Sequence, residues 1–414
     1  MDATGNNKLI NLIILSIIFL TIVELNKYVF FINKFLITNP IIEYSITYLI
    51  SFFTLIFFFR NYNNINENIV LKNFIKLYFL YFSINIIFSF FFAQTYFQYK
   101  YIFISFIPQI VFVLFFSFGF MYENVKKIFR IYSIFFFPIG ILLIFFNFYE
   151  IKGFYPRLFV PISFLLLFFP YFNKINKIFF IIFSFIILFI DTSHRTGTFS
   201  ILFSIILILT YYFNIRSTKF YLFSFYNIIF IPLFFFILFF VFKIDIFEFI
   251  SNSFVNNTDN QSDIFANTRS FLYINIFNEL SNNNWFLFGG GAQASYTSEF
   301  FSKSLSSYGL LIYQEGRFAS EIGFLNIILK SGIIGFFLYS FIFFYSSYIG
   351  ITNSKNTFCK ILSLKIIFFW FLLFIEIPGG VNLNSYFIYV FIGLVLSKKL
   401  RSLSDFEIRE VFKF

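Results

Sequence analysis

Long apolar runs separated by short polar stretches constrain this chain more than any other feature of its sequence. A helix that crosses a bilayer needs about 20 mostly apolar residues. Twelve such runs occur, the sixth and seventh of them short, and they start near Leu9, Ile41, Phe74, Ile102, Ile131, Leu158, Ile178, Thr196, Lys219, Ile322, Ile361 and Ser385. The pattern predicts an all-α integral membrane protein with about 12 transmembrane helices.

The composition supports this interpretation. Hydrophobic residues make up 59% of the 414 residues and charged residues only 12%, whereas soluble domains carry roughly 25% charged residues. A water-soluble globular protein is therefore excluded, as are disordered and collagen-like chains. The single cysteine, Cys359, excludes an intrachain disulfide and is predicted to lie in a cytoplasmic loop.

The basic residues predict the orientation of the chain. The net charge is +11, but the charges lie in short loops between apolar runs, where the positive-inside rule explains them better than a nucleic-acid partner does. With twelve spans, 19 of the 30 Lys and Arg residues fall on one side, including Lys355, Lys360 and Lys365 in one loop. That side is predicted to be cytoplasmic and to hold both termini.

One segment between the spans is large enough to fold outside the membrane. It covers residues 243–321, or 79 residues, and joins the ninth and tenth spans on the outer face. The chain is thus divided into transmembrane helices 1–9 (residues 1–242), a large periplasmic or extracellular loop (243–321), and transmembrane helices 10–12 with a cytoplasmic tail (322–414). The two halves do not mirror each other, unlike those of many inverted-repeat transporters.

Polar residues at membrane depth are costly and usually functional. Glu43 and Asn85 are such residues in the early spans. A denser cluster precedes the eighth span, where Asp191 is followed by His194 and Arg195. Arg195 is either a snorkelling arginine in a polar turn or an anion-binding group held at membrane level by Asp191. Because His194 is the only histidine, no His-based metal site can form.

The outer loop contains a predicted helix. Helical periodicity runs over residues 269–280, and the spacing of Arg269, Tyr273 and Phe277 places the three side chains on one helix face. Trp285 and Phe288 follow this helix and suit an anchor at the membrane interface.

Three consecutive glycines, Gly289, Gly290 and Gly291, come next. Glycine lets a backbone approach a ligand closely, and successive N–H groups can be presented to an anion. The alternative for a bare glycine triplet is a flexible turn.

Arg317 and Glu321 lie four residues apart at the entrance to the tenth span, which predicts that they share one helix face. The planar guanidinium of arginine suits phosphate because it can bind two oxygens at once. A neighbouring carboxylate can accept a proton from an attacking hydroxyl. Glu315 is the reserve carboxylate. The alternative is an exposed ion pair at the membrane rim, which contributes little.

Several common motifs are missing from the sequence. There is no GxxxxGK[ST] phosphate-binding loop, no HExxH, no Cys/His cluster and no Asp-x-Asp pair. The sequence therefore predicts neither a nucleoside triphosphatase nor a zinc or other metal site, and it indicates no cofactor.

Three segments together resemble the O-antigen polymerase/O-antigen ligase superfamily of bacterial envelope enzymes. Residues 192–196, with Arg195, are similar to the polar turn with an arginine that opens a span in this family. Arg269 and the helix that ends near Gly289 are similar to the arginine-led segment that ends in Gly-x-Gly. Glu321, followed eleven residues later by Gly332-Ile333-Ile334-Gly335, is similar to the segment that ends in Gly-Ile-x-Gly.

The resemblance covers residues 185–345 by motif and the whole chain by topology. Ligases of the superfamily carry a histidine at the position aligned with Glu321, and this departure favours a polymerase. The resemblance implies a metal-independent glycosyltransferase in the bacterial inner (cytoplasmic) membrane. It would join undecaprenyl-diphosphate-linked oligosaccharide repeat units, as donor and acceptor, into O antigen or capsular polysaccharide on the outer face. A chain-length regulator and a flippase would be its partners.

The hypothesis for the site assigns three arginines to the diphosphate, Arg195, Arg269 and Arg317, because no metal motif supplies another cation. Backbone N–H groups of Gly289, Gly290 and Gly291 would assist them. Glu321 is the candidate base, and Asp191, Glu315 and Tyr273 are candidate supporting residues.

Other functions stay open. A different membrane glycosyltransferase fold would use an acidic residue in its first outer loop, for which Glu24 or Glu43 could serve, but that loop is short. A ligase that transfers glycan to lipid A-core would have the same topology but lacks its expected histidine here. A flippase or transporter of the same lipid-linked sugar would predict paired halves and charges through the middle of many spans.

Overall fold

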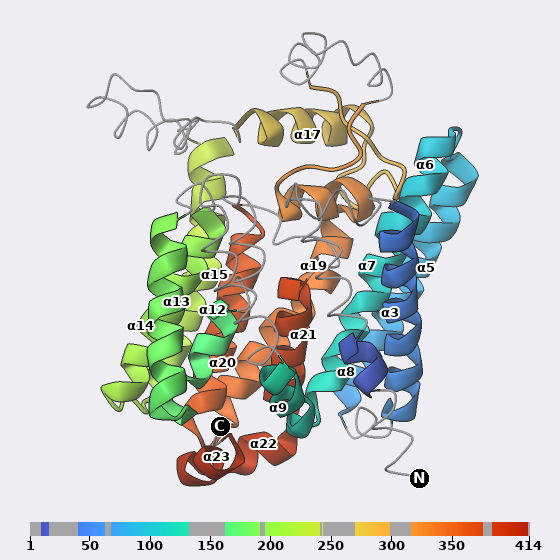
Figure 1. The fold of residues 1–414 in the computed structure, drawn as a ribbon. Coiled ribbons are helices and arrows are strands. Elements are labelled where there is room, and N and C mark those ends of the chain that lie inside the picture. The colour runs from blue at the N-terminus through green and yellow to red at the C-terminus, as the bar shows by residue number, and fades with distance from the viewer. Residues whose placement is uncertain are drawn as a thin grey trace.

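The computed structural model describes residues 10–15, 40–62, 68–131, 162–190, 195–240, 242, 270–298, 316–375 and 383–412. Over these residues the chain forms helices and no β-strand, which confirms the all-α prediction (Figure 1). A single antiparallel bridge pairs Tyr296 with Arg317.

The helices follow one another along the chain in three groups. The first group contains α3 (Pro40–Arg60), α5 (Ile69–Phe92), α6 (Tyr96–Tyr101), the π-helical η1 (Ile102–Phe106), α7 (Ile107–Phe112), the 3₁₀ turn η2 (Val113–Phe115), α8 (Phe116–Gly119) and α9 (Tyr122–Ile131). The second contains α12 (Ile162–Leu165), the 3₁₀ helix η4 (Leu166–Tyr171), α13 (Lys174–Ile190), α14 (Arg195–Tyr212) and α15 (Thr218–Phe240). The third contains α17 (Ser270–Asn282), α19 (Gly323–Thr352), α20 (Thr357–Leu372), α21 (Leu383–Leu396), α22 (Lys398–Ser402) and α23 (Asp405–Val411).

Four helical segments of the described residues are long and apolar enough to cross a bilayer: Ile69–Phe92, Tyr96–Gly119, Thr218–Leu238 and Gly323–Thr352. Shorter apolar helices cover Tyr44–Arg60, Ile162–Tyr171, Gly197–Tyr212 and Ser385–Leu396. These helices are compatible with a membrane protein. Most of the first and fifth predicted spans lies outside the described residues. The total of twelve spans, and the side of the membrane on which the termini lie, therefore stay predictions.

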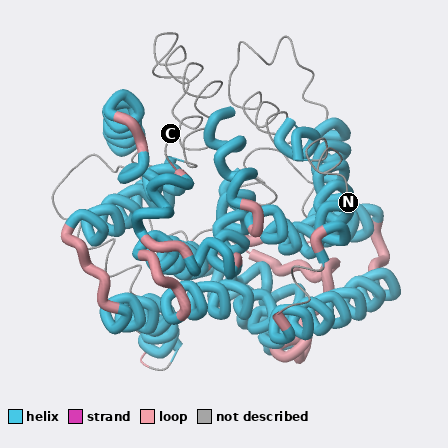
Figure 2. Tube along the Cα trace, turned by 90° about the horizontal axis from the view of Figure 1, so that it is seen from below, coloured by secondary structure: helices cyan, strands magenta, loops and turns pink. Residues whose placement is uncertain are grey.

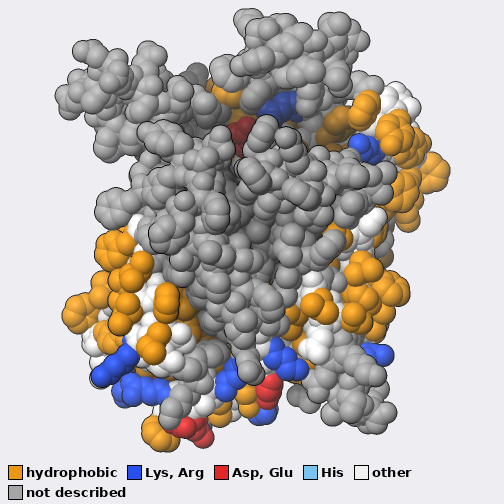
Figure 3. All heavy atoms as spheres, in the orientation of Figure 1, with side chains coloured by type: hydrophobic (Ala, Val, Ile, Leu, Met, Phe, Trp, Pro, Cys, Tyr) orange, Lys and Arg blue, Asp and Glu red, His pale blue; other side chains and the backbone are white. Residues whose placement is uncertain are grey.

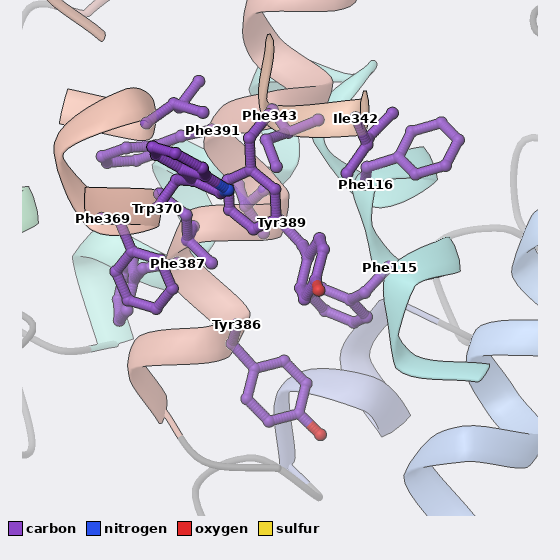
Figure 4. Packing of buried hydrophobic residues seen from close by; sticks show 14 of the residues in the cluster. Phe115, Phe116, Ile342, Phe343, Phe369, Trp370, Tyr386, Phe387, Tyr389 and Phe391 are labelled. Carbon is purple, nitrogen blue, oxygen red and sulfur yellow. The ribbon is translucent and has the colours of Figure 1, made fainter. Parts of the chain in front are cut away.

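Helices α19, α20 and α21 pack against one another near the centre of the bundle, and α8 packs on α21 (Figure 1). The view from below shows that the described residues are mostly helix, joined by loops (Figure 2). Gly119 of α8 and Gly393 of α21 permit the contact between these two helices, because a Cβ at Gly393 would lie 1.9 Å from the carbonyl oxygen of Phe116. Small residues allow such close backbone approach between helices in membranes. Aromatic rings fill the remaining space (Figure 4), and the buried indole of Trp370 donates a hydrogen bond to Ser340 Oγ at 2.8 Å.

Basic side chains gather at the end of the bundle opposite α17, where α22 and α23 lie (Figures 1 and 3). Hydrogen bonds tie the turns of this end together. The side chain of Asn356 donates to the carbonyl oxygens of Leu400 and Leu403 at 3.0 and 2.9 Å, and Lys360 Nζ donates to the carbonyl of Arg216 at 3.0 Å. This distribution agrees with the charge asymmetry used to predict a cytoplasmic side.

The sequence predicts that Lys360, Lys365 and Cys359 lie in a cytoplasmic loop, but all three belong to helix α20, so their placement in a loop is wrong. Helix α20 begins at Thr357, capped by Asn356, so Lys365 lies in its third turn and is 1% exposed. Its Nζ donates to the carbonyl oxygen of Ser200 at 2.7 Å and to the hydroxyls of Ser200 and Ser204 at 2.7 and 2.8 Å. Cys359 is fully buried in the first turn.

Lys365→Met tests whether this cluster holds α14 against α20. We expect the variant to melt at a lower temperature in detergent, because it removes three buried hydrogen bonds to a charged group, each of which contributes about 1.5–3 kcal/mol. Lys399→Met, at an exposed lysine of α22, is the control and should melt like the wild type. Equal melting temperatures for the wild type, Lys365→Met and Lys399→Met would contradict the role of Lys365 in holding α14 against α20.

Candidate functional site at the break in α19

Helix α19 is interrupted in the middle of its apolar run. Gly332 has φ 62° and ψ −172°, so the helical hydrogen bonds stop there and resume beyond it. The break lies nine residues from the start of the helix, or about 14 Å along its axis. Backbone groups left unpaired at membrane depth cost several kcal/mol each, so the break has to be bonded by another part of the chain.

A loop of residues 285–291, named here the sealing loop, supplies these partners. On one side of the break, the N–H groups of Gly290 and Gly291 donate to the carbonyl oxygens of Leu329 and Lys330 at 2.9 and 3.0 Å. On the other side, the N–H of Ile333 donates to the carbonyl of Phe286 at 2.8 Å. The loop therefore bonds both halves of α19.

Helix α5 completes the arrangement from a third direction. The hydroxyl of Tyr81 donates to the carbonyl of Ser331 at 2.5 Å, and the amide of Asn85 donates to the carbonyl of Lys330 at 3.1 Å. Ser89 Oγ accepts from the N–H of Ala292 at 2.7 Å. Asn85, noted in the sequence as a polar residue inside a span, thus helps to satisfy the broken helix.

These contacts give the glycine triplet a structural role. The N–H groups of Gly289, Gly290 and Gly291 all donate to carbonyl oxygens within the chain, whereas the sequence suggested that they face an anion. Gly289 has φ 75°, and a Cβ there would lie 2.4 Å from the carbonyl of Lys330. At Gly290 a Cβ would meet the ring of Trp285 at 2.5 Å. Glycine is required because the backbones approach closely.

The predicted helix of the outer loop is confirmed as α17, which lies across one end of the bundle (Figure 1). Tyr273 and Phe277 share a face, as expected, and both rings pack on Phe236 of α15 with centroids 5.7 and 5.9 Å away. The hydroxyl of Tyr273 donates to the carbonyl of Phe374 at 2.6 Å. Tyr273, predicted to support the site, anchors α17 to the bundle.

Arg317 and Glu321 meet, but not on a helix. The guanidinium and the carboxylate are 4.0 Å apart, with side chains 23% and 54% exposed. Helix α19 begins only at Gly323, so the predicted shared helix face is wrong. The segment bends instead, because Asn326 accepts from the N–H of Ser320 at 2.5 Å and donates to its carbonyl at 2.8 Å.

The backbone of Arg317 is fixed by Tyr296. The two residues exchange N–H···O hydrogen bonds of 2.9 and 3.0 Å, and this bridge joins the ends of the described outer-loop segments. Burial raises the pKa of the Tyr296 hydroxyl, and the positive charge of Arg317 opposes that increase. An arginine held by its own backbone beside a carboxylate can present a fixed cation to an anionic ligand.

The remaining predicted site residues fall outside this arrangement. Asp191, Arg269 and Glu315 lie outside the described residues, as does His194. Arg195 is the first residue of α14, and only its backbone is described. Their roles stay predictions.

Lys330 is a site candidate that the sequence analysis does not single out. It lies two residues before the break, is 3% exposed, and donates from Nζ to the hydroxyl of Tyr101. A lysine inside an apolar run was the available signal, because charges at membrane depth are usually functional. Within the described part of the chain, no three His, Cys, Asp or Glu side chains group as metal ligands do.

Comparison of the chain with protein-family models, with curated proteins and with solved structures gives no match.

Gly332→Ala tests the break. We expect lower thermal stability in detergent and loss of function, because alanine disfavours positive φ by roughly 1–2 kcal/mol and its Cβ would lie 2.3 Å from the carbonyl oxygen of Leu287. Ile333→Ala removes a 40% exposed neighbouring side chain and keeps the N–H that bonds Phe286, so it serves as the control. A Gly332→Ala protein as stable as this control would contradict the sealed break.

Proposed function

We propose that the protein is a membrane glycosyltransferase that polymerises undecaprenyl-diphosphate-linked oligosaccharide repeat units into O antigen or capsular polysaccharide. The reaction would take place on the outer face of the bacterial inner membrane. The proposal rests on the resemblance of the sequence motifs and on one structural observation, the pairing of Arg317 with Glu321 at 4.0 Å just before α19.

The surroundings of the pair support this proposal. The pair adjoins the outer loop, so a lipid-linked substrate could keep its tail in the bilayer and bring its head group to the pair. Arg317 is held through Tyr296, and Glu321 precedes a span that is itself fixed by the sealing loop. Preorganised charges of this kind stabilise a developing anion without reorganisation during the reaction.

The proposed reaction is a displacement at the anomeric carbon of the donor glycan. An acceptor hydroxyl forms the new C–O bond, and the bond from the anomeric carbon to the diphosphate oxygen breaks. Undecaprenyl diphosphate leaves with the electron pair, and its charge is stabilised by Arg317, with Arg195 and Arg269 as further proposed cations. The hydroxyl proton passes to the Glu321 carboxylate, which is the proposed general base.

Arg317→Ala and Arg269→Ala test the assigned cations. Each should abolish chain extension, seen as loss of the polysaccharide ladder on a gel, while the protein still accumulates in the membrane fraction. Arg216→Ala removes an exposed arginine at the opposite end of the bundle and should leave the ladder unchanged. A normal ladder from both Arg317→Ala and Arg269→Ala strains would refute the site assignment.

Glu321→Gln tests the proposed base. The amide keeps the size of the side chain but cannot accept the proton, so we expect the rate of chain extension to fall by about 100-fold or more. Glu279→Gln, on α17, is the matched control and should extend chains normally. Unchanged extension by the Glu321→Gln protein would transfer the role of base to Glu315 or another group.

A deletion strain separates the polymerase from its rivals. Lipid A-core that carries a single repeat unit, with the ladder gone, supports polymerisation. Loss of all attached glycan, with long polymer on the lipid carrier, would indicate a ligase. Single units trapped on the cytoplasmic face would indicate a flippase, for which a broken helix is also a known feature.

A further inference from the structure

Lys330 and Lys365 are the two most deeply buried lysines of the described residues, at 3% and 1% exposure. An ammonium group has three N–H donors. The Nζ of Lys365 has three acceptors within 2.8 Å, all from two serines of α14. The Nζ of Lys330 has one hydrogen-bond partner among the described residues, the Tyr101 hydroxyl. Among the described residues, all three donors of Lys365 thus have acceptors, whereas Lys330 has an acceptor for only one of its donors.

The other surroundings of Lys330 compensate its charge only in part. Its Nζ lies 3.9 Å from the centroid of the Tyr101 ring, a cation–π contact. In the described residues no carboxylate forms an ion pair with it. A buried charge is strongly unfavourable unless it is paired and hydrogen-bonded, so this environment favours an anion that enters from outside.

A cavity of about 50 Å³ adjoins Lys330. This space holds more than one water molecule, which needs about 10–15 Å³. Four aromatic residues and two isoleucines line it together with the polar residues Gln109, Asn326 and Ser331. Gln109 is also exposed on α7, so this residue is the lining position that can be altered from outside the bundle.

The cavity is connected to the Arg317–Glu321 segment through two contacts. Asn326, in the cavity wall, holds Ser320 of that segment with two hydrogen bonds. The ring of Tyr101, which contacts Lys330, stacks on Phe318 at a centroid distance of 5.8 Å. Lys330 and the cavity wall are thereby connected to the two residues, Phe318 and Ser320, that lie next to Arg317 and Glu321 in the chain.

We propose that Lys330 and this cavity form an anion subsite that takes one phosphate of a polyprenyl diphosphate. The identity of the ligand rests on the proposed function; the existence of the subsite rests on the cavity and on the unused donors. A volume of about 50 Å³ suits a single phosphate group better than a sugar ring or a lipid tail. The second phosphate and the polyprenyl tail would then lie outside the cavity.

Binding of undecaprenyl diphosphate to the purified full-length protein in lipid nanodiscs tests this subsite. We expect Lys330→Met to weaken binding at least ten-fold, because the ammonium is lost. The break in α19 stays sealed, since Gly291 and Asn85 bond the main-chain carbonyl of Lys330 and not its side chain. Lys399→Met is the control, because Lys399 also lies over a tyrosine ring, that of Tyr122, at the opposite end of the bundle. Wild-type affinity in Lys330→Met would overturn the proposal.

Gln109→Trp provides a second test that leaves the lysine in place. The larger side chain should fill the cavity from its exposed side and weaken binding of undecaprenyl diphosphate at least ten-fold, whereas inorganic phosphate alone should compete only weakly. Unchanged affinity in this variant would overturn the cavity as the binding site. This result from Gln109→Trp would count against the proposal even if the Lys330→Met protein failed to fold.

The subsite and the proposed function can fail separately. If the wild-type protein binds undecaprenyl diphosphate through Lys330 but the deletion strain keeps its ladder, the subsite stands and the polymerase is refuted. If the ladder is lost but Lys330→Met binds and extends chains as the wild type does, the polymerase stands and the subsite is refuted. Absence of any undecaprenyl diphosphate binding by the wild-type protein overturns the subsite.

Discussion

The hydrogen bonds across the break in α19 are the constraint on which the rest of the site depends. A helix interrupted at Gly332 cannot exist in lipid unless its carbonyl and N–H groups find partners. The sealing loop bonds both halves of α19, and α5 adds bonds from a third direction. These bonds fix the position of the sealing loop relative to α5 and α19. The segment with Arg317 and Glu321 precedes the first half of α19 and Lys330 lies near the end of that half, so this short stretch of helix sets their separation.

Much of the fold could be predicted from the sequence because it depends on local pattern. Apolar runs and the four-residue spacing of Tyr273 and Phe277 specify helices directly. The function of the glycine triplet could not be predicted, because its partner, the break at Gly332, lies 41 residues beyond Gly291 in the chain. Gly332 was visible only as part of a motif, and nothing local indicates a positive φ. The proximity of Arg317 and Glu321 was predictable, but the bend that Asn326 imposes was not.

Charge counting also has a physical limit that this chain illustrates. The positive-inside rule treats every lysine near the end of a span as a loop charge. Lys365 and Lys330 should not be counted as loop charges, because neighbouring helices enclose their side chains and ammonium groups. Three acceptor atoms from Ser200 and Ser204 bond the ammonium group of Lys365. The sequence alone does not show which serines face which helix. Only the packing of the helices shows whether a buried lysine has acceptors for all its N–H groups or for some of them.

The order of the segments along the chain has a consequence for biogenesis. The sealing loop precedes α19 and so leaves the ribosome before it. When the second half of α19 reaches the lipid, the loop that bonds it has already been synthesised. If α19 inserted without the sealing loop beside it, bare peptide groups would be left in the bilayer. Correct insertion of α19 is thereby coupled to the placement of the loop that comes before it.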